Sequence, residues 1–236
     1  MFFNHKNTEP GQPQGSNPFF YYGGNYPGET SEPFYHSGIK SYNLRVSIST
    51  HIGKVRGNHE DNFYLEGLYM NDIFRNDFSA SYTIHYADGM SFAVFDGMGG
   101  AAYGEVASEI AVQTLRKYEK KLKHADGTRM LDQLISSYTS EANNAICDML
   151  TEKHCQNGGT TFSMLYFLGD AVKLYYLGDS RIYRYQGSDL TLLTRDHTVA
   201  NQKVEAAIYT EEEAKHSPDQ HRLTSVSYTH LRAHET

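Results

Sequence analysis

The chain has 236 residues, of which 39 % are hydrophobic and 21 % are charged, a size that suits one domain with a sizeable core. Its net charge of −7 argues against nucleic-acid binding, because proteins that bind nucleic acids usually carry a basic surface for the phosphates. No apolar run approaches the roughly 20 residues of a membrane helix, the first ten residues do not resemble a signal peptide, and there are two cysteines, so we expect a cytoplasmic protein without membrane partners.

Residues 1–40 differ in composition from the rest of the chain. They are rich in Gly, Pro, Asn and Tyr, show no periodicity, and contain five of the six prolines. Such a segment buries too little apolar surface to offset its ordering entropy, so we predict a disordered tail. Its aromatic cluster, residues 19–22, leaves a docking motif as an alternative.

Regular patterns begin near Tyr42. The stretch "NLRVSIST" alternates apolar and polar residues as a half-buried strand does, and "NFYLEGLYM" and "SASYTIHYA" are further strand candidates. The dipeptide Asp88-Gly89 then lies between two strand-like runs, which predicts a hairpin. Two amphipathic helices are predicted next, in "YGEVASEIAVQTLRKYEKKLK" and in "RMLDQLISSYTSEANNAICDML".

From Gly158 the period returns to two, which predicts three or four short strands. Gly169-Asp170, Gly187-Ser188 and the stretch "LGDS" mark the breaks between them, and residues 198–215 look helical or irregular. Strands, two helices and strands again predict a layered α+β domain with mainly antiparallel sheets rather than a doubly wound fold.

Asp96 follows the apolar run "FAVF" and precedes three glycines, so it is a candidate for a turn, a phosphate contact or a metal site. A phosphate-binding loop would need G-x-x-x-x-G-K-[ST] or G-x-G-x-x-G, and "DGMGGAAYGE" contains neither. For the Asp-Gly pair taken alone, a simple turn remains open.

Other acidic residues at strand ends favour the metal site. Glu60 and Asp61 precede a strand in "GKVRGNHEDN", Asp179 follows one in "YLGDSR", and "RDH" marks another strand end. Carboxylates and carbonyls are the ligands that Mg²⁺ and Mn²⁺ prefer. Gly97 has no Cβ, which would let its carbonyl approach a cation.

Five motifs occur in one order, namely "VRGNHEDN", "FAVFDGMGG", "GGTT", "LGDSR" and "LTRDH". This set resembles the bacterial form of the metal-dependent Ser/Thr protein phosphatases of the 2C type, the PPM family, over about residues 42–224. The resemblance implies an α-β-β-α sandwich of antiparallel sheets flanked by helices. It also implies hydrolysis of phosphoserine and phosphothreonine by metal-activated water, with two or three Mn²⁺ or Mg²⁺ ions.

The resemblance also implies a role for each matching residue. The expected metal ligands are Asp96, which bridges two ions, the carbonyl of Gly97, the acidic pair Glu60 and Asp61, and Asp179 at an additional ion. Arg56 matches the arginine that grips the substrate phosphate and, with Asp96, is the expected catalytic pair. Two positions differ from the wider family: His59 stands where Asn is usual, and Met98, shared by bacterial members, replaces a histidine of eukaryotic members that is proposed as general acid.

The end of the chain departs from the family pattern. After Asp196 there is one aspartate, Asp219, whereas the family supplies two more ligand aspartates on its last strands. We therefore expect an incomplete, C-terminally truncated phosphatase domain over 41–224 that lacks its last strands and is weakly active or inactive. Residues 225–236 resemble translated sequencing-adapter read-through, and a divergent native terminus is the alternative.

Two other functions remain open at this stage. One is an inactive fragment or pseudophosphatase that binds phosphoproteins, and the other is a relative of the same fold acting on sporulation or stress regulators. For the phosphatase, we expect a monomer whose partners are phosphorylated proteins, namely a Ser/Thr kinase and its substrates.

Overall fold

The computed structural model describes residues 2–3, 43–70, 77–85, 89–98, 103–155, 157–168 and 171–224. Its centre is a five-stranded sheet with the order β10-β9-β6-β3-β4, in which every pair is antiparallel. The strands are β3 (Asn62–Leu65), β4 (Leu68–Tyr69), β6 (Ser91–Phe95), β9 (Phe162–Leu168) and β10 (Ala171–Leu177). Strand β9 is buried along nearly its whole length, because the sheet is covered on both faces.

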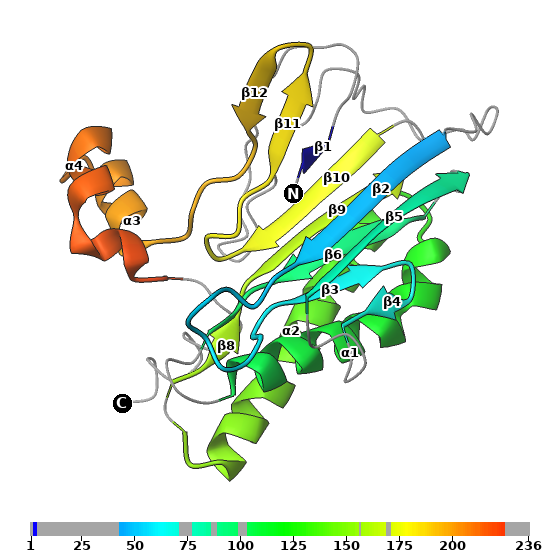
Figure 1. The fold of residues 1–236 in the computed structure, drawn as a ribbon, viewed down its shortest axis with the longest axis horizontal. Helices are drawn as coiled ribbons and strands as arrows, with labels where there is room; N and C mark the ends of the chain where they lie inside the picture. The colour runs from blue at the N-terminus through cyan, green and yellow to red at the C-terminus, as the bar shows by residue number, and fades with distance from the viewer. Residues whose placement is uncertain are drawn as a thin grey trace.

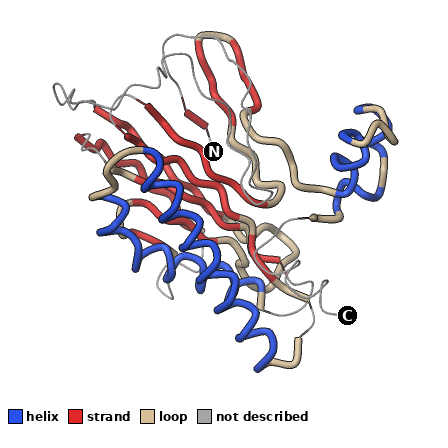
Figure 2. Tube along the Cα trace, turned by 180° about the vertical axis from the view of Figure 1, so that it is seen from behind, coloured by secondary structure: helices blue, strands red, loops and turns tan. Residues whose placement is uncertain are grey.

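Helices α1 (Gly104–Lys123) and α2 (Thr128–Glu152) cover one face of this sheet (Figures 1 and 2). Both predicted helices are therefore confirmed. Their buried residues recur every three or four positions, as in Leu131, Ile135, Tyr138 and Ala142, and they pack on inward side chains of the strands such as Met164. A series of lysines in the last turn of α1 complements the helix dipole.

A two-stranded ribbon, β2 (Asn43–Thr50) and β5 (Phe78–His85), covers the other face of the sheet (Figure 1). Its inward residues, among them Leu44, Val46 and Ile48, pack on Phe63 and Phe92 of the sheet. On the outer face, cross-strand serines form hydrogen bonds with each other. The alternation of "NLRVSIST" therefore arises from a half-buried strand, as predicted.

One turn was missed in a predicted strand, and one predicted hairpin does not form. The stretch "NFYLEGLYM" is a hairpin rather than one strand, because Glu66 (φ 44°) and Gly67 (φ 89°) form a two-residue turn between β3 and β4. The Asp88-Gly89 hairpin does not form between its flanking strands: over the described residues β5 pairs with β2, and β6 pairs with β3 and β9. Asp88 itself lies outside the described residues, as does the predicted turn at Gly169-Asp170.

Smaller elements complete the β-structure. Strands β7 (Gly97–Met98) and β8 (Gly159–Thr160) form a short pair. Strands β11 (Tyr183–Gln186) and β12 (Asp189–Leu192) form a hairpin around the predicted Gly187-Ser188 turn, and β1 (Phe2–Phe3) pairs with β11 in parallel. Apart from this β1–β11 pair, the described strand pairs are antiparallel, which confirms a mixed α+β fold with mainly antiparallel sheets.

Residues 198–223 form a separate lobe of short helices, α3 (Val199–Glu205), α4 (Glu211–His216) and the 3₁₀ helix η1 (Pro218–His221). Thr198 and Leu223 pair with each other in an antiparallel bridge, so the lobe begins and ends at the same place. Figure 1 shows it beyond the end of the sheet rather than over it. Within the described residues the layers are helices, sheet and ribbon, and the second helical layer of the expected sandwich stays a prediction.

Of the predicted tail at 1–40, the structure describes Phe2–Phe3, which form β1; the rest of the tail and residues 225–236 lie outside the described residues, so the predictions for them remain predictions. None of the helices that the structure describes is long and apolar enough to cross a membrane.

Candidate active site

The sheet register brings the predicted acidic residues to one edge of the sheet. Asn62 of β3 lies opposite Phe95 of β6, so Asp61 and Asp96, one position beyond each, leave the sheet side by side. Leu177, the last residue of β10, lies opposite Phe162, the first of β9, which places Asp179 at the same edge. Three residues far apart in the sequence thus converge because neighbouring antiparallel strands begin and end together.

Asp96 is the most perturbed acid of this edge. Its side chain keeps contact with solvent, yet surrounding protein atoms desolvate the carboxylate, and the negative charges of Asp61 and Asp179 add to the effect. Together they raise the pKa of Asp96 to about 6, and the Arg56 guanidinium opposes the rise. Four of the predicted site residues therefore lie within electrostatic reach of one another.

Thr161 holds the backbone at Asp96. The N–H of Asp96 donates to Oγ1 of Thr161 at 3.0 Å, and the N–H of Thr161 donates to the carbonyl of Asp96 at 2.9 Å. The same Oγ1 is hydrogen-bonded to the hydroxyl of Ser180, 2.6 Å away. Thr161 thereby connects three motifs. The sequence contained it within "GGTT" but gave no sign of this role, since hydrogen-bond partners 65 and 19 residues away are set by the fold.

Gly97 is required for packing as well as for a free carbonyl. A Cβ at this position would lie 2.3 Å from the carbonyl oxygens of both Glu60 and Gly104. Three backbone segments therefore meet at Gly97: the loop before β3, strand β7 and the beginning of α1. Ser108 of α1 fixes the same contact by donating its hydroxyl to the carbonyl of Glu60 at 2.7 Å.

Arg56 and Glu60 form an ion pair beside this edge, with 3.5 Å between Nη1 of Arg56 and Oε2 of Glu60. The arginine side chain is 64 % exposed, so it is available to an incoming anion. The carboxylate of Glu60 faces Arg56 and the first residue of α1. Glu60 and Asp61 stay the predicted acidic pair, with Glu60 turned toward Arg56 among the described contacts.

His59 contacts the backbone of Asp61. Its Nδ1 accepts the N–H of Asp61 at 3.3 Å. Its Nε2 is buried without a hydrogen-bond partner among the described residues, beside a small pocket lined by Asp61, Glu105 and Glu109. The histidine thus shapes the loop at Asp61.

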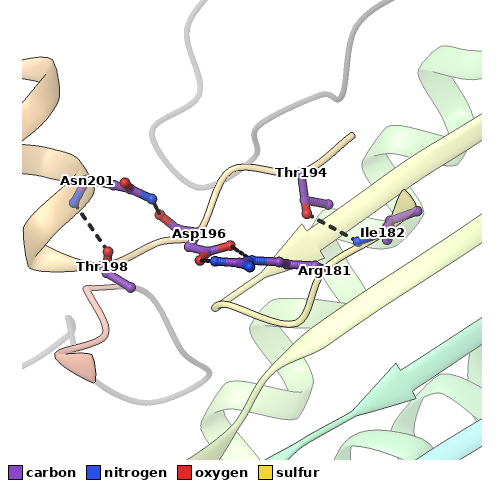
Figure 3. A network of polar contacts seen from close by, with 6 residues as sticks. All are labelled: Arg181, Ile182, Thr194, Asp196, Thr198 and Asn201. Carbon is purple, nitrogen blue, oxygen red and sulfur yellow. Dashed lines mark hydrogen bonds and ion pairs between the residues drawn. The ribbon is translucent and has the colours of Figure 1, made fainter. Parts of the chain in front are cut away.

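Asp179 lies in a short loop, Gly178 to Arg181, that is fastened to the segment after β12. The N–H of Gly178 donates to Nδ1 of His197, and the N–H of His197 donates to the carbonyl of Gly178. Arg181 binds the carboxylate of Asp196 through both Nε and Nη2 (Figure 3). Burial raises the pKa of Asp179, and the charge of Asp196 contributes to the rise.

The sequence matches a known family over most of its length. Residues 68–231 match the family described as "Protein phosphatase 2C". The chain belongs to the protein phosphatase 2C family.

Two curated 2C-type relatives show how much of the family the chain covers. It is 30 % identical over 187 residues to the "Serine/threonine protein phosphatase PstP" of Mycobacterium tuberculosis, covering 79 % of this chain and 31 % of that protein. It is 26 % identical over 184 residues to the "Protein phosphatase PhpP" of Streptococcus pneumoniae, covering 77 % of this chain and 66 % of the relative. The chain thus spans less than two thirds of these relatives.

Solved 2C-type structures share the fold. The M. tuberculosis serine/threonine phosphatase PstP superposes with a TM-score of 0.54 at 26 % identity, over 78 % of this chain and 68 % of that one. A structure of the catalytic domain of PstP in complex with two manganese ions gives a TM-score of 0.53 at 26 % identity, over 79 % and 67 %. A Streptococcus agalactiae phosphatase at 23 % identity gives 0.60 over 79 % and 69 %, which supports the fold alone.

The acidic edge of this 2C-type chain suits a hard cation in donor type and charge. Asp61, Asp96 and Asp179 are oxygen donors, and the pKa of Asp96 is raised first by burial and then by the negative charges of Asp61 and Asp179, which a cation would neutralise. Within the described residues, however, no three acidic, histidine or cysteine side chains are close enough together to enclose an ion. The edge therefore gathers oxygen donors of the type a hard cation prefers, and their role as ligands stays a prediction.

Proposed function

We propose that this chain is the greater part of a metal-dependent protein serine/threonine phosphatase. The observation that carries the proposal is the convergence of Asp61, Asp96 and Asp179 at one sheet edge within reach of Arg56. Membership of the protein phosphatase 2C family supports the same reaction class.

The chain's own residues have distinct roles in this proposal. Arg56 binds the phosphate of the substrate, because an exposed guanidinium makes charge-assisted, bidentate bonds to phosphate oxygens. It exchanges its ion pair with Glu60 for the phosphate. Thr161 holds the backbone of Asp96 in place.

Mn²⁺ or Mg²⁺, as two or three ions, is the proposed cofactor. Asp96, Asp61, Asp179, Glu60 and the carbonyl of Gly97 would hold it. When bound, it supplies a water of lowered pKa for attack on phosphorus and positive charge for the phosphoryl oxygens. Asp96 must be ionised for this role, and a pKa near 6 leaves it ionised at neutral pH.

The test is hydrolysis of p-nitrophenyl phosphate and of phosphoserine and phosphothreonine peptides with and without Mn²⁺. We expect Mn²⁺-dependent turnover that Asp96→Asn abolishes and Arg56→Ala lowers mainly through a higher KM. Arg129→Ala, an exposed arginine in the first turn of α2, is the matched control and should leave turnover unchanged. The same assay is run on the longer protein that is encoded when the gene is continued into its downstream DNA. If neither that protein nor this chain shows Mn²⁺-dependent turnover, the proposal of an enzyme is refuted.

A second candidate function is phosphoprotein binding without catalysis, as an inactive fragment or pseudophosphatase. It is favoured by the incomplete ligand set, because the one aspartate after Asp196, Asp219, is occupied by ion pairs with Lys203 and Arg222. This function predicts that a phosphopeptide binds the chain, measured by calorimetry, with loss on Arg56→Ala and without turnover.

We further propose that the partners are a cytoplasmic Ser/Thr kinase and its phosphorylated substrates, and that the protein is a monomer. Light scattering tests the monomer. Loss of kinase-dependent phosphorylation on adding the active protein tests the partners.

A further inference from the structure

The loop that bears Asp179 is held at both ends by one dipeptide, Asp196-His197. At its beginning, Gly178 exchanges two hydrogen bonds with His197, at 3.0 and 3.2 Å. At its end, Arg181 binds Asp196. Asp179 lies between these two attachments and has little freedom to move independently of them.

Two nitrogens of Arg181 bind the two carboxylate oxygens of Asp196. Nε of Arg181 lies 2.9 Å from Oδ1 of Asp196, and Nη2 lies 2.6 Å from Oδ2. The aspartate side chain is only 15 % exposed, so water competes weakly for its oxygens. A planar guanidinium in this arrangement fixes direction as well as distance, which an ammonium group would not do.

Asp196 also connects this loop to the lobe at 198–223. Its carbonyl accepts Nδ2 of Asn201 on α3 at 2.7 Å, and Thr198 caps the same helix by accepting the N–H of Asn201 (Figure 3). Asp196 therefore contacts the Asp179 loop through its carboxylate and the lobe through its backbone.

We propose that the Arg181–Asp196 ion pair is a positioning device that holds Asp179 at the acidic edge and joins it mechanically to the lobe. The metal part of this inference rests on the proposed function. Arg181 and Asp196 are positioning residues, because they act on the site through Asp179.

Charge gives the pair a second effect. Asp196 repels Asp179, and Arg181 offsets that repulsion. Removing Arg181 alone would free the loop and leave the carboxylate of Asp196 uncompensated beside Asp179. Removing both partners would free the loop and also remove a negative charge that attracts a cation, so the double variant should bind Mn²⁺ no better than Arg181→Ala.

The test compares Arg181→Ala, Arg181→Lys and the double variant Arg181→Ala/Asp196→Ala with the unchanged 236-residue chain. Arg195→Ala is the matched control, since Arg195 is a half-exposed arginine that pairs with Glu205 and not with the loop. Hydrogen exchange reports the amides of Gly178 and His197, and calorimetry with MnCl₂ reports metal affinity.

We expect Arg181→Ala to speed exchange at both amides and to weaken Mn²⁺ binding, each by about five- to tenfold, with α1 and α2 unchanged. Arg181→Lys should be intermediate, the double variant should exchange as fast as Arg181→Ala and bind Mn²⁺ no better, and Arg195→Ala should match the unchanged chain. Equal exchange in Arg181→Ala and the unchanged chain would overturn the positioning role whether or not Mn²⁺ binds. Absence of Mn²⁺ binding by the unchanged chain would instead count against the proposed function.

Discussion

The N–H of Asp96 donates to Oγ1 of Thr161 at 3.0 Å, although the two residues are 65 positions apart. Thr161 is 2 % exposed, so no water can replace this bond. The aspartate at the centre of the acidic edge is therefore oriented by a buried hydroxyl rather than by its own loop.

Substitution of Thr161 by valine tests this orientation. The shape is kept while the acceptor for Asp96 and the partner of Ser180 are lost, so we expect destabilisation of about 1–3 kcal/mol, measured by urea denaturation. Thr161→Ser keeps the hydroxyl and should lose less, about 1 kcal/mol for the missing methyl group. A valine variant as stable as the serine variant would contradict the argument.

Replacement of Asp96 by asparagine should have opposite effects on stability and on metal binding. Without metal, it removes one of three crowded carboxylates and should raise stability at pH 7 by about 1 kcal/mol, a figure reduced because Asp96 is exposed. Addition of Mn²⁺ should raise the melting temperature of the unchanged chain and leave that of the variant unchanged. Thermal denaturation with MnCl₂ and with a chelator measures both, and equal Mn²⁺ stabilisation of the two chains would remove Asp96 from the ligand set.

Gly97→Ala should unfold the region around the site. The added Cβ would lie 2.3 Å from two carbonyl oxygens, and backbone on both sides must move, so we expect a loss of more than about 3 kcal/mol. Gly57→Ala is the control from the neighbouring loop, where no atom lies within 4 Å of the new Cβ. It should change the free energy of unfolding by less than about 0.5 kcal/mol. Similar losses for the two variants would show that crowding at Gly97 is not the cause.

The stability of the lobe should depend on pH through Asp219. Lys203 first, and then Arg222, lower the pKa of Asp219 below its ordinary value of 3.8. The folded state then binds fewer protons than the unfolded state, so the ion pairs stabilise the lobe above about pH 4, and this contribution is lost as the pH falls toward the lowered pKa. Hydrogen exchange over 199–224 should show faster exchange for Asp219→Asn at pH 7, with the difference shrinking toward pH 3. A difference that persists at pH 3 would assign the effect to packing.

Periodicity predicted the helices and β2 well, because in these segments the spacing of apolar residues along the chain shows which side chains are buried. The helices at 104–123 and 128–152 carry apolar residues at helical spacing, and β2 alternates strictly. It missed the turn at Glu66-Gly67, because Gly67 was the one turn residue there and Glu at positive φ is not typical of a two-residue hairpin loop. It failed at Asp88-Gly89 because strand pairing is decided by the whole sheet.

The positions of the acidic residues at strand ends could also be predicted from the sequence. Asp61, Asp96 and Asp179 each follow or precede a strand, and the register then brings them together. The ion pair of Glu60 with Arg56 and the hydrogen bonds of Thr161 could not be predicted, because their geometry depends on contacts between distant segments. The ligand roles of these residues stay predictions.

The bridge between Thr198 and Leu223 has a consequence for how such chains can diversify. Because Val199 donates its N–H to Arg222 and Thr224 donates its N–H to His197, the two strands of backbone that enter and leave the lobe already form a closed neck. These bonds involve backbone atoms alone, so they do not depend on the length of the segment that they enclose. A change in the length of the lobe beyond Asn201 would therefore leave both the neck and the bond of Asn201 to Asp196 in place.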